Sequence, residues 1–182
     1  MCSSDLLTVG IVGFGGIGRA VARLARAFGM RVVGSKRTRV EDPALDRLYS
    51  PEQLAALLSE SDFVVLAAPE NEQTRGMIDA AALEQMKPKA LLINVARGGL
   101  IDEEDLVDAL RRKRIGGAVL DVTSNEPLPE TSPLWDLPNC VITPHDSGFS
   151  PLSIERALDL FLENLGRFRR GEPLLNEVRP GD

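Results

Sequence analysis

Short apolar runs alternate with longer amphipathic stretches along this chain. The first run, Leu6 to Val12, is brief and rich in β-branched residues, which is typical of a buried parallel strand. From Ile17 to Phe28 the apolar residues recur at helical spacing, and Gly29 follows as a stop signal. The pattern therefore predicts a strand followed directly by a helix with one buried face.

The same order recurs along the rest of the chain. Ser50-Pro51-Glu52-Gln53 predicts a helix start with a capping box. Asp102 predicts another capped helix, with acidic residues in its first turn and basic residues in its last. A long amphipathic helix is predicted from Ile154 to Phe168, with Gly171 as its end. Further strands are predicted at residues 31–34, 63–67, 90–94, 116–121 and 140–143.

Strands that alternate with helices in this way predict an α/β fold. We expect a Rossmann-type doubly wound parallel sheet, with helices on both faces and right-handed crossovers. Ligands of such sheets bind at the carboxyl ends of the strands. Residues that follow the predicted strands should therefore gather along one crevice, namely Gly15, Lys36, Pro69, Arg97, Asp121 and His145.

Three glycines in the turn after the first strand fit the pattern G-x-G-x-x-G. Gly13 would form the tight turn, Gly15 would let the backbone approach a pyrophosphate, and Gly18 would let helix and strand pack closely. The free N–H groups and the dipole of the helix N-terminus would favour the anion. Glycine-rich turns also occur for purely structural reasons, but the order strand, turn, helix favours a dinucleotide site.

A basic run follows the second predicted strand, where dinucleotide-binding folds contact the adenosine ribose. An acidic residue there binds the 2′-hydroxyl of NAD, whereas arginine accommodates the 2′-phosphate of NADP. Lys36 and Arg37 stand at this position, and a guanidinium beside an ammonium suits a dianionic phosphate. We therefore expect NADP as the preferred cofactor and NAD as the second choice, with a solvated charged loop as the structural alternative.

Composition narrows the class of protein further. The 182 residues, 43% hydrophobic and 26% charged, suit one globular domain. A net charge of −6 argues against a nucleic-acid surface, and no apolar run reaches membrane-spanning length. Cys2 and Cys140 lack metal-ligand spacing, so we expect no metal site, reduced thiols and a cytoplasmic location. Residues 1–6 run straight into a core strand and are expected to be a non-native leader.

Three polar residues suggest the chemistry of the crevice. His145, the single histidine, is the candidate proton donor. Glu126 lies in the loop that leaves the neighbouring strand, and a carboxylate bonded to the imidazole would stabilise its protonated form. Arg97 could hold a substrate carboxylate through two parallel bonds and polarise a carbonyl. With a nicotinamide cofactor, these groups predict the reduction of a 2-keto acid.

Several motifs resemble the D-isomer-specific 2-hydroxyacid dehydrogenase family. They are Gly13 to Gly18, Asn94 to Asp102, Leu120 to Pro127 and Pro144 to Gly148, in the family's order. The resemblance implies that the catalytic set is Arg97, Glu126 and His145. It also implies cofactor contacts from Gly16 and Ile17 at the pyrophosphate, Lys36 at the ribose, Asp121 at the nicotinamide amide, and Ala68, Pro69, Val95, Ala96, Ser147 and Gly148.

The resemblance also implies a homodimer formed through the cofactor domain, and a substrate domain ahead of it. Residues 7–150 are expected to form the NAD(P)-binding domain, and residues 151–182 a helix and tail that would pack on the missing substrate domain. Lys36 in place of the family's usual acid favours NADPH and a reductase of glyoxylate or hydroxypyruvate type. One alternative is a nucleotide-sensing binding module without turnover, similar to corepressors related to the family. Another is a truncated gene product without activity.

Overall fold

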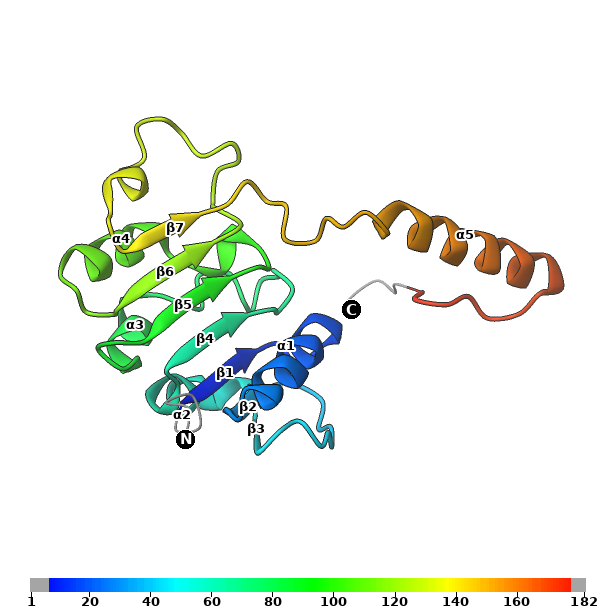
Figure 1. Cartoon of the computed structure of the whole chain (residues 1–182), viewed down its shortest axis with the longest axis horizontal. Coiled ribbons are helices and arrows are strands. Elements are labelled where there is room, and N and C mark those ends of the chain that lie inside the picture. Colours follow the sequence, from blue (N-terminus) through cyan, green and yellow to red (C-terminus); the bar gives the residue numbers. More distant parts are fainter. Residues whose placement is uncertain (1–6, 178–182) are drawn as a thin grey trace. The chain divides into compact units, whose positions relative to one another are not determined.

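Seven parallel strands form one sheet in the order β3-β2-β1-β4-β5-β6-β7 (Figure 1). The order changes direction between β1 and β4, and ligands of such sheets bind beside that point. The computed structural model describes residues 7–177. The strands are β1 (Thr8–Val12), β2 (Arg31–Ser35), β3 (Arg47–Tyr49), β4 (Phe63–Leu66), β5 (Leu91–Asn94), β6 (Gly117–Leu120) and β7 (Cys140–Ile142). The helices are α1 (Gly16–Ala27), α2 (Leu54–Glu60), α3 (Ala80–Gln85), α4 (Glu103–Arg111) and α5 (Ser153–Arg170).

Strand β3 is an addition to the six strands that the sequence pattern predicts. It has three residues and lies at the edge of the sheet, where it pairs with β2. Three residues are too few to display a recognisable alternation of buried and exposed side chains, although Arg47 is exposed and Tyr49 is buried. Its place is set by pairing, with Val33 opposite Arg47.

Hydrophobic cores lie on both faces of the sheet. On one face, Leu57 of α2 and Leu106 of α4 belong to the same buried cluster as Leu92 of β5. On the other face, Ala22 of α1 packs in a second cluster with Ile11 of β1. Helices therefore cover both faces, which confirms the predicted doubly wound α/β fold. None of the described helices is long and apolar enough to cross a membrane.

Local signals determine where several helices begin and end. Ser50 donates its N–H to the side chain of Gln53 at 3.1 Å, which completes the predicted capping box before α2. The Asp102 carboxylate accepts the N–H of Glu104 at 3.1 Å at the start of α4. Gly171 ends α5 in the left-handed conformation, with φ 68°.

The chain is divided into two compact units, of which the first ends at Ser147 and the second begins at Gly148. The second unit is built on α5, in which no residue is buried. Asn164 holds the tail against this helix, since its side chain donates to the Leu175 carbonyl at 3.0 Å and accepts the Leu175 N–H at 2.7 Å. The packing of this unit on another domain stays a prediction, and the expected leader at 1–6 lies outside the described residues.

Candidate active site

The turn between β1 and α1 has the features of a dinucleotide cradle. Gly13 has φ 95°, and a Cβ there would overlap the backbone nitrogen of Ala68, so only glycine fits. A Cβ on Gly15 or Gly16 would meet no atom within 4 Å, so the space beside them is open. The N-terminus of α1 has no side-chain cap, which leaves its first N–H groups available to an anion.

A cavity of about 380 Å³ extends from this turn to the end of β2. Lys36 and Arg37 line it together with Ala68 and Pro69, which follow β4. Neither basic side chain forms an ion pair with any residue that the structure describes. Two uncompensated positive charges near a helix N-terminus favour a phosphate. The residues present therefore fit a dinucleotide with a 2′-phosphate.

A second crevice, of about 600 Å³, runs from Ile17 to the end of β5, where Val95, Ala96 and Arg97 line it. Asn94 is fully buried and shapes this strand end. Its side chain donates to the Arg97 carbonyl at 2.9 Å and accepts the Ala96 N–H at 3.1 Å. The Arg97 side chain itself stays exposed. A polar residue at the end of a buried apolar strand is the signal that could have identified Asn94.

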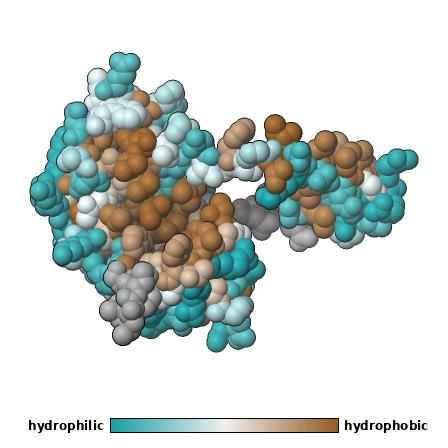
Figure 2. All heavy atoms as spheres, in the orientation of Figure 1, coloured by the Kyte–Doolittle hydropathy of each residue, from teal (hydrophilic) through white to brown (hydrophobic). Residues whose placement is uncertain are grey.

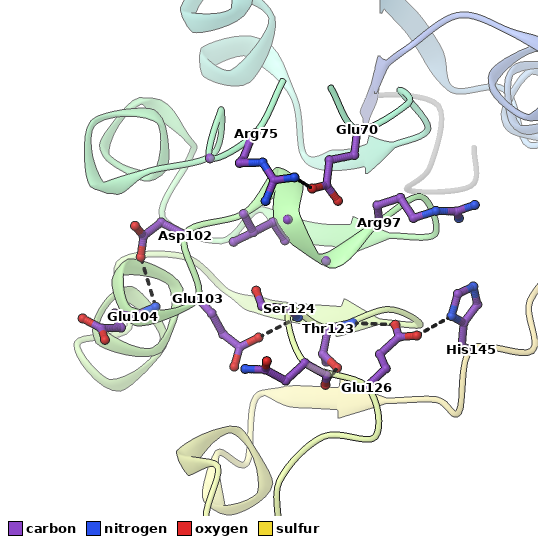
Figure 3. A pocket seen from close by; sticks show the side chains of 15 residues that line it. Glu70, Arg75, Arg97, Asp102, Glu103, Glu104, Thr123, Ser124, Glu126 and His145 are labelled. Carbon is purple, nitrogen blue, oxygen red and sulfur yellow. Dashed lines mark hydrogen bonds and ion pairs between the residues drawn. The ribbon is translucent and has the colours of Figure 1, made fainter. Parts of the chain in front are cut away.

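Close packing brings the turn after β5 against the loop after β6. A Cβ on Gly98 would overlap the backbone of Thr123, so a larger residue cannot occupy this position without a shift. Glu126 lies in the same loop and accepts the Thr123 N–H at 3.1 Å. As a result, Arg97, Glu126 and His145 line one cavity of about 690 Å³ (Figure 3). The structure thus brings together the three residues predicted to be catalytic.

His145 and Glu126 form a hydrogen-bonded pair, with 2.7 Å between Nδ1 and Oε2 (Figure 3). The bond to His145 lowers the pKa of Glu126, against the opposing effect of burial, and the Thr123 N–H lowers it further. The carboxylate is therefore ionised at neutral pH and can only accept a hydrogen bond. It follows that Nδ1 carries a proton, and Nε2 is the ring atom left for a substrate.

Asp121, at the end of β6, anchors the segment that carries His145. One carboxylate oxygen accepts the Thr143 hydroxyl at 2.5 Å and the Asp146 N–H at 3.1 Å. The other accepts the Ser147 N–H at 3.0 Å. Burial opposes ionisation of this group, but hydrogen bonds from Ser147 and Thr143 outweigh burial and lower the pKa of Asp121 to about 2. These bonds make Asp121 a positioning residue, and its contact with a nicotinamide amide stays a prediction.

Glu70 was not predicted, and no sequence pattern identified it. It follows Pro69 in the loop after β4, forms an ion pair with Arg75 at 2.7 Å, and lines the same cavity as His145. Gly148 belongs to the second unit, so its cofactor contact stays a prediction. Within residues 7–177 there is no group of three His, Cys, Asp or Glu side chains that could hold a metal ion.

Known proteins resemble this chain over nearly its whole length. The family model described as D-isomer specific 2-hydroxyacid dehydrogenase, NAD binding domain, matches residues 4–147. A glyoxylate reductase of Thermococcus onnurineus is 42% identical over 184 residues, which cover 96% of this chain and 54% of that protein. An (S)-sulfolactate dehydrogenase of Chromohalobacter salexigens is 43% identical over 161 residues, or 88% of this chain and 52% of that protein. The chain spans about half the length of these curated relatives.

A solved structure shares the fold closely. The D-isomer specific 2-hydroxyacid dehydrogenase of Xanthobacter autotrophicus Py2, solved in complex with NADPH and MES, has a TM-score of 0.90 and 37% identity. The match covers 96% of this chain and 71% of that one. The two molecules therefore share the same fold.

Proposed function

Because this chain belongs to the D-isomer-specific 2-hydroxyacid dehydrogenase family through its NAD-binding domain, we propose that the protein reduces a small 2-keto acid with NADPH. The observation that carries this proposal is the shared cavity of Arg97, Glu126 and His145, with the acid–base pair already hydrogen-bonded. The relatives named above support a small acid and leave its charge open, since glyoxylate carries one negative charge and sulfolactate carries two.

Each side chain has a defined task in this reaction. Arg97 binds the substrate carboxylate and orients the neighbouring carbonyl toward His145. When bound, the reduced nicotinamide supplies a hydride. His145 donates the proton from Nε2 to the carbonyl oxygen of the substrate as the C=O π bond breaks. Glu126 accepts the hydrogen bond from Nδ1 and so keeps the ring oriented with Nε2 available to the substrate.

Replacement of His145 tests the reaction. In the complete gene product, His145→Gln is expected to lower kcat for glyoxylate by roughly 10² to 10⁴, because the general acid is lost. NADPH binding, followed by nucleotide fluorescence, should stay unchanged. Glu130→Gln, at an exposed acid in the same loop as Glu126, is the control. Full activity of His145→Gln would remove His145 as the proton donor. A wild-type protein that binds NADPH but reduces no 2-keto acid would instead support the nucleotide-sensing alternative.

The preference for NADPH over NADH is a separate part of the proposal. It is supported by the two uncompensated charges of Lys36 and Arg37 in the cavity beside the glycine turn. The double variant Lys36→Asp, Arg37→Ala should lose the preference by roughly tenfold or more, as expected when charge-assisted bonds to a phosphate are removed. Fluorescence titration with both nucleotides measures this. Arg39→Ala is the matched control, because Arg39 belongs to the same basic run but does not line the cavity.

We further propose a homodimer formed through the cofactor domain. Its support is a row of apolar side chains that the sequence pattern placed on the buried face of the first helix but that the structure leaves exposed. Ile17 and Leu24 of α1 are 55% and 65% exposed, and Phe28, the C-cap residue of this helix, is 68% exposed. These residues are seven and four positions apart, so they share one face of the helix. Contiguous apolar surface of this kind is typical of protein interfaces.

The free thiol of Cys140 supports the cytoplasmic location that we propose for the reaction.

A further inference from the structure

Glu70 lies at the junction of the two spaces that the proposed reaction needs. Glu70 and Arg97 each line both the crevice that begins at Ile17 and the cavity that contains His145. Figure 3 shows the Glu70 carboxylate beside the turn that follows Arg97. An acidic and a basic side chain therefore line both of the spaces between which a keto acid would meet the cofactor.

The carboxylate of Glu70 is held against the backbone of this turn. A Cβ built on Gly99 would lie 2.5 and 2.7 Å from its two oxygens. Arg75 Nη2 lies 2.7 Å from Oε1, but the Arg75 side chain is 73% exposed whereas that of Glu70 is 22% exposed. An ion pair with one partner in solvent is strongly screened. The negative charge on the cavity wall is therefore only partly neutralised.

Three further acidic side chains contribute to the wall of the cavity. Asp102, Glu103 and Glu104 line it. Of the two arginines in the wall, Arg75 is paired with Glu70, whereas Arg97 has no carboxylate partner among the described residues. The cavity thus offers one binding position for an anion, at Arg97.

Resting on the proposed function, we propose that Glu70 restricts the site to 2-keto acids that carry a single negative charge. A small keto acid bound to Arg97 through its carboxylate keeps its remaining atoms within the same cavity. A second carboxylate or a sulfonate would then meet Glu70 and the acidic wall, and like charges at close range repel strongly where water is partly excluded. An uncharged group meets no such repulsion. Glu70 thereby separates the two substrate classes left open above.

A pair of keto acids of equal length tests this role. Oxaloacetate and its monoamide, 2-oxosuccinamate, differ by one charge, and glyoxylate serves as the reference substrate. With the complete gene product and NADPH, kcat/KM should favour the amide over oxaloacetate. Glu70→Gln should reduce this preference on the order of tenfold, because repulsion is removed and the Arg75 guanidinium is released. Arg75→Gln should increase the preference, because Glu70 loses its counter-charge.

Glu72→Gln is the matched control. Glu72 is an exposed acid in the same loop that does not line the cavity, so its loss changes the net charge equally and should leave the preference unchanged. If Glu70→Gln still reduces glyoxylate with an unaltered preference, the role of Glu70 is wrong and the proposed function stands. If the wild type reduces none of the three acids, the proposed function fails, and the inference fails with it.

Discussion

Two carboxylates determine how His145 is presented to a substrate. Glu126 accepts the Nδ1 proton and so selects the tautomer of the ring. Asp121 accepts hydrogen bonds from Thr143, Asp146 and Ser147 on either side of the histidine, which has φ 56°. A left-handed backbone at a residue other than glycine persists only where its surroundings hold it. Asp121 therefore stabilises the fold and the geometry of the site through the same bonds.

Replacing Asp121 should lower stability in a pH-dependent manner. Since the pKa of Asp121 is lowered from 3.8 to about 2, Asp121→Asn should lose on the order of 2 kcal/mol of unfolding free energy at pH 7. A lowered pKa in the folded state stabilises fully above the unfolded pKa, and this stabilisation disappears as the pH falls through the folded pKa. The difference between wild type and variant should therefore shrink between about pH 4 and pH 2. Urea denaturation at pH 7 and pH 3 measures it, and an equal difference at both values would contradict the assignment.

At the level of the elements, the site depends on how closely neighbouring strand ends approach. The turn after β1 meets the end of β4 at Gly13, and the turn after β5 meets the loop after β6 at Gly98. Each contact is between backbones, so no side-chain rearrangement can relieve an added methyl group. The glycine turn belongs to the proposed cofactor site, whereas the Gly98 contact positions Arg97, so separate mutations can test the two contacts.

Gly98→Ala is expected to damage catalysis more than cofactor binding. The added Cβ would overlap Thr123, so the turn must shift and move Arg97 with it. Overpacking of this kind costs roughly 1–3 kcal/mol of stability. The KM for glyoxylate should rise by a larger factor than the Kd for NADPH, because the proposed pyrophosphate site lies at the other turn. Gly166→Ala in α5 is the control, because its Cβ would approach only the flexible end of Arg170, at 3.1 Å. Equal behaviour of the two variants would count against the Gly98 contact.

In the first unit, helices cover the two faces of the sheet unequally. Three helices pack on one face, whereas α1 is the helix on the other. On the α1 face, Val141 of β7 remains 57% exposed, and Figure 2 shows apolar side chains gathered over the strands on this side. Apolar surface of this extent favours burial against another chain or domain. The exposed row on α1 lies on the helix that packs on this face, and it is where the proposed dimer can be tested.

Leu24→Glu should weaken the proposed dimer. Leu24 is 65% exposed in the single chain, so the change should leave the fold intact but place a charge in an apolar interface. Light scattering of the complete gene product should show a shift from dimer to monomer at micromolar concentration. Thr131→Glu, at an exposed position in the loop between β6 and β7, adds the same charge and should not change the mass. An unaltered mass for Leu24→Glu would exclude this face of α1 from the interface.

Prediction from sequence succeeded where the signal is local. The order of the elements, the capping residues Ser50 and Asp102 and the glycine turn each depend on a few consecutive residues whose conformational preferences are intrinsic. The sequence also predicted that Arg97, Glu126 and His145 lie close together, because the carboxyl ends of parallel strands meet at one edge of the sheet. Strand β3 was missed because three residues carry no periodicity, and its partner is supplied by β2.

The amino-acid sequence by itself determined the family, the strand and helix order and the residues able to carry the chemistry, since these depend on short-range preferences and residue types. Only the tertiary structure decided that Asn94 shapes the Arg97 turn, that Asp121 is occupied with the histidine segment, and that Glu70 stands at the cavity junction. These roles arise from contacts between segments that fold together from distant parts of the chain, and no local pattern encodes such distances.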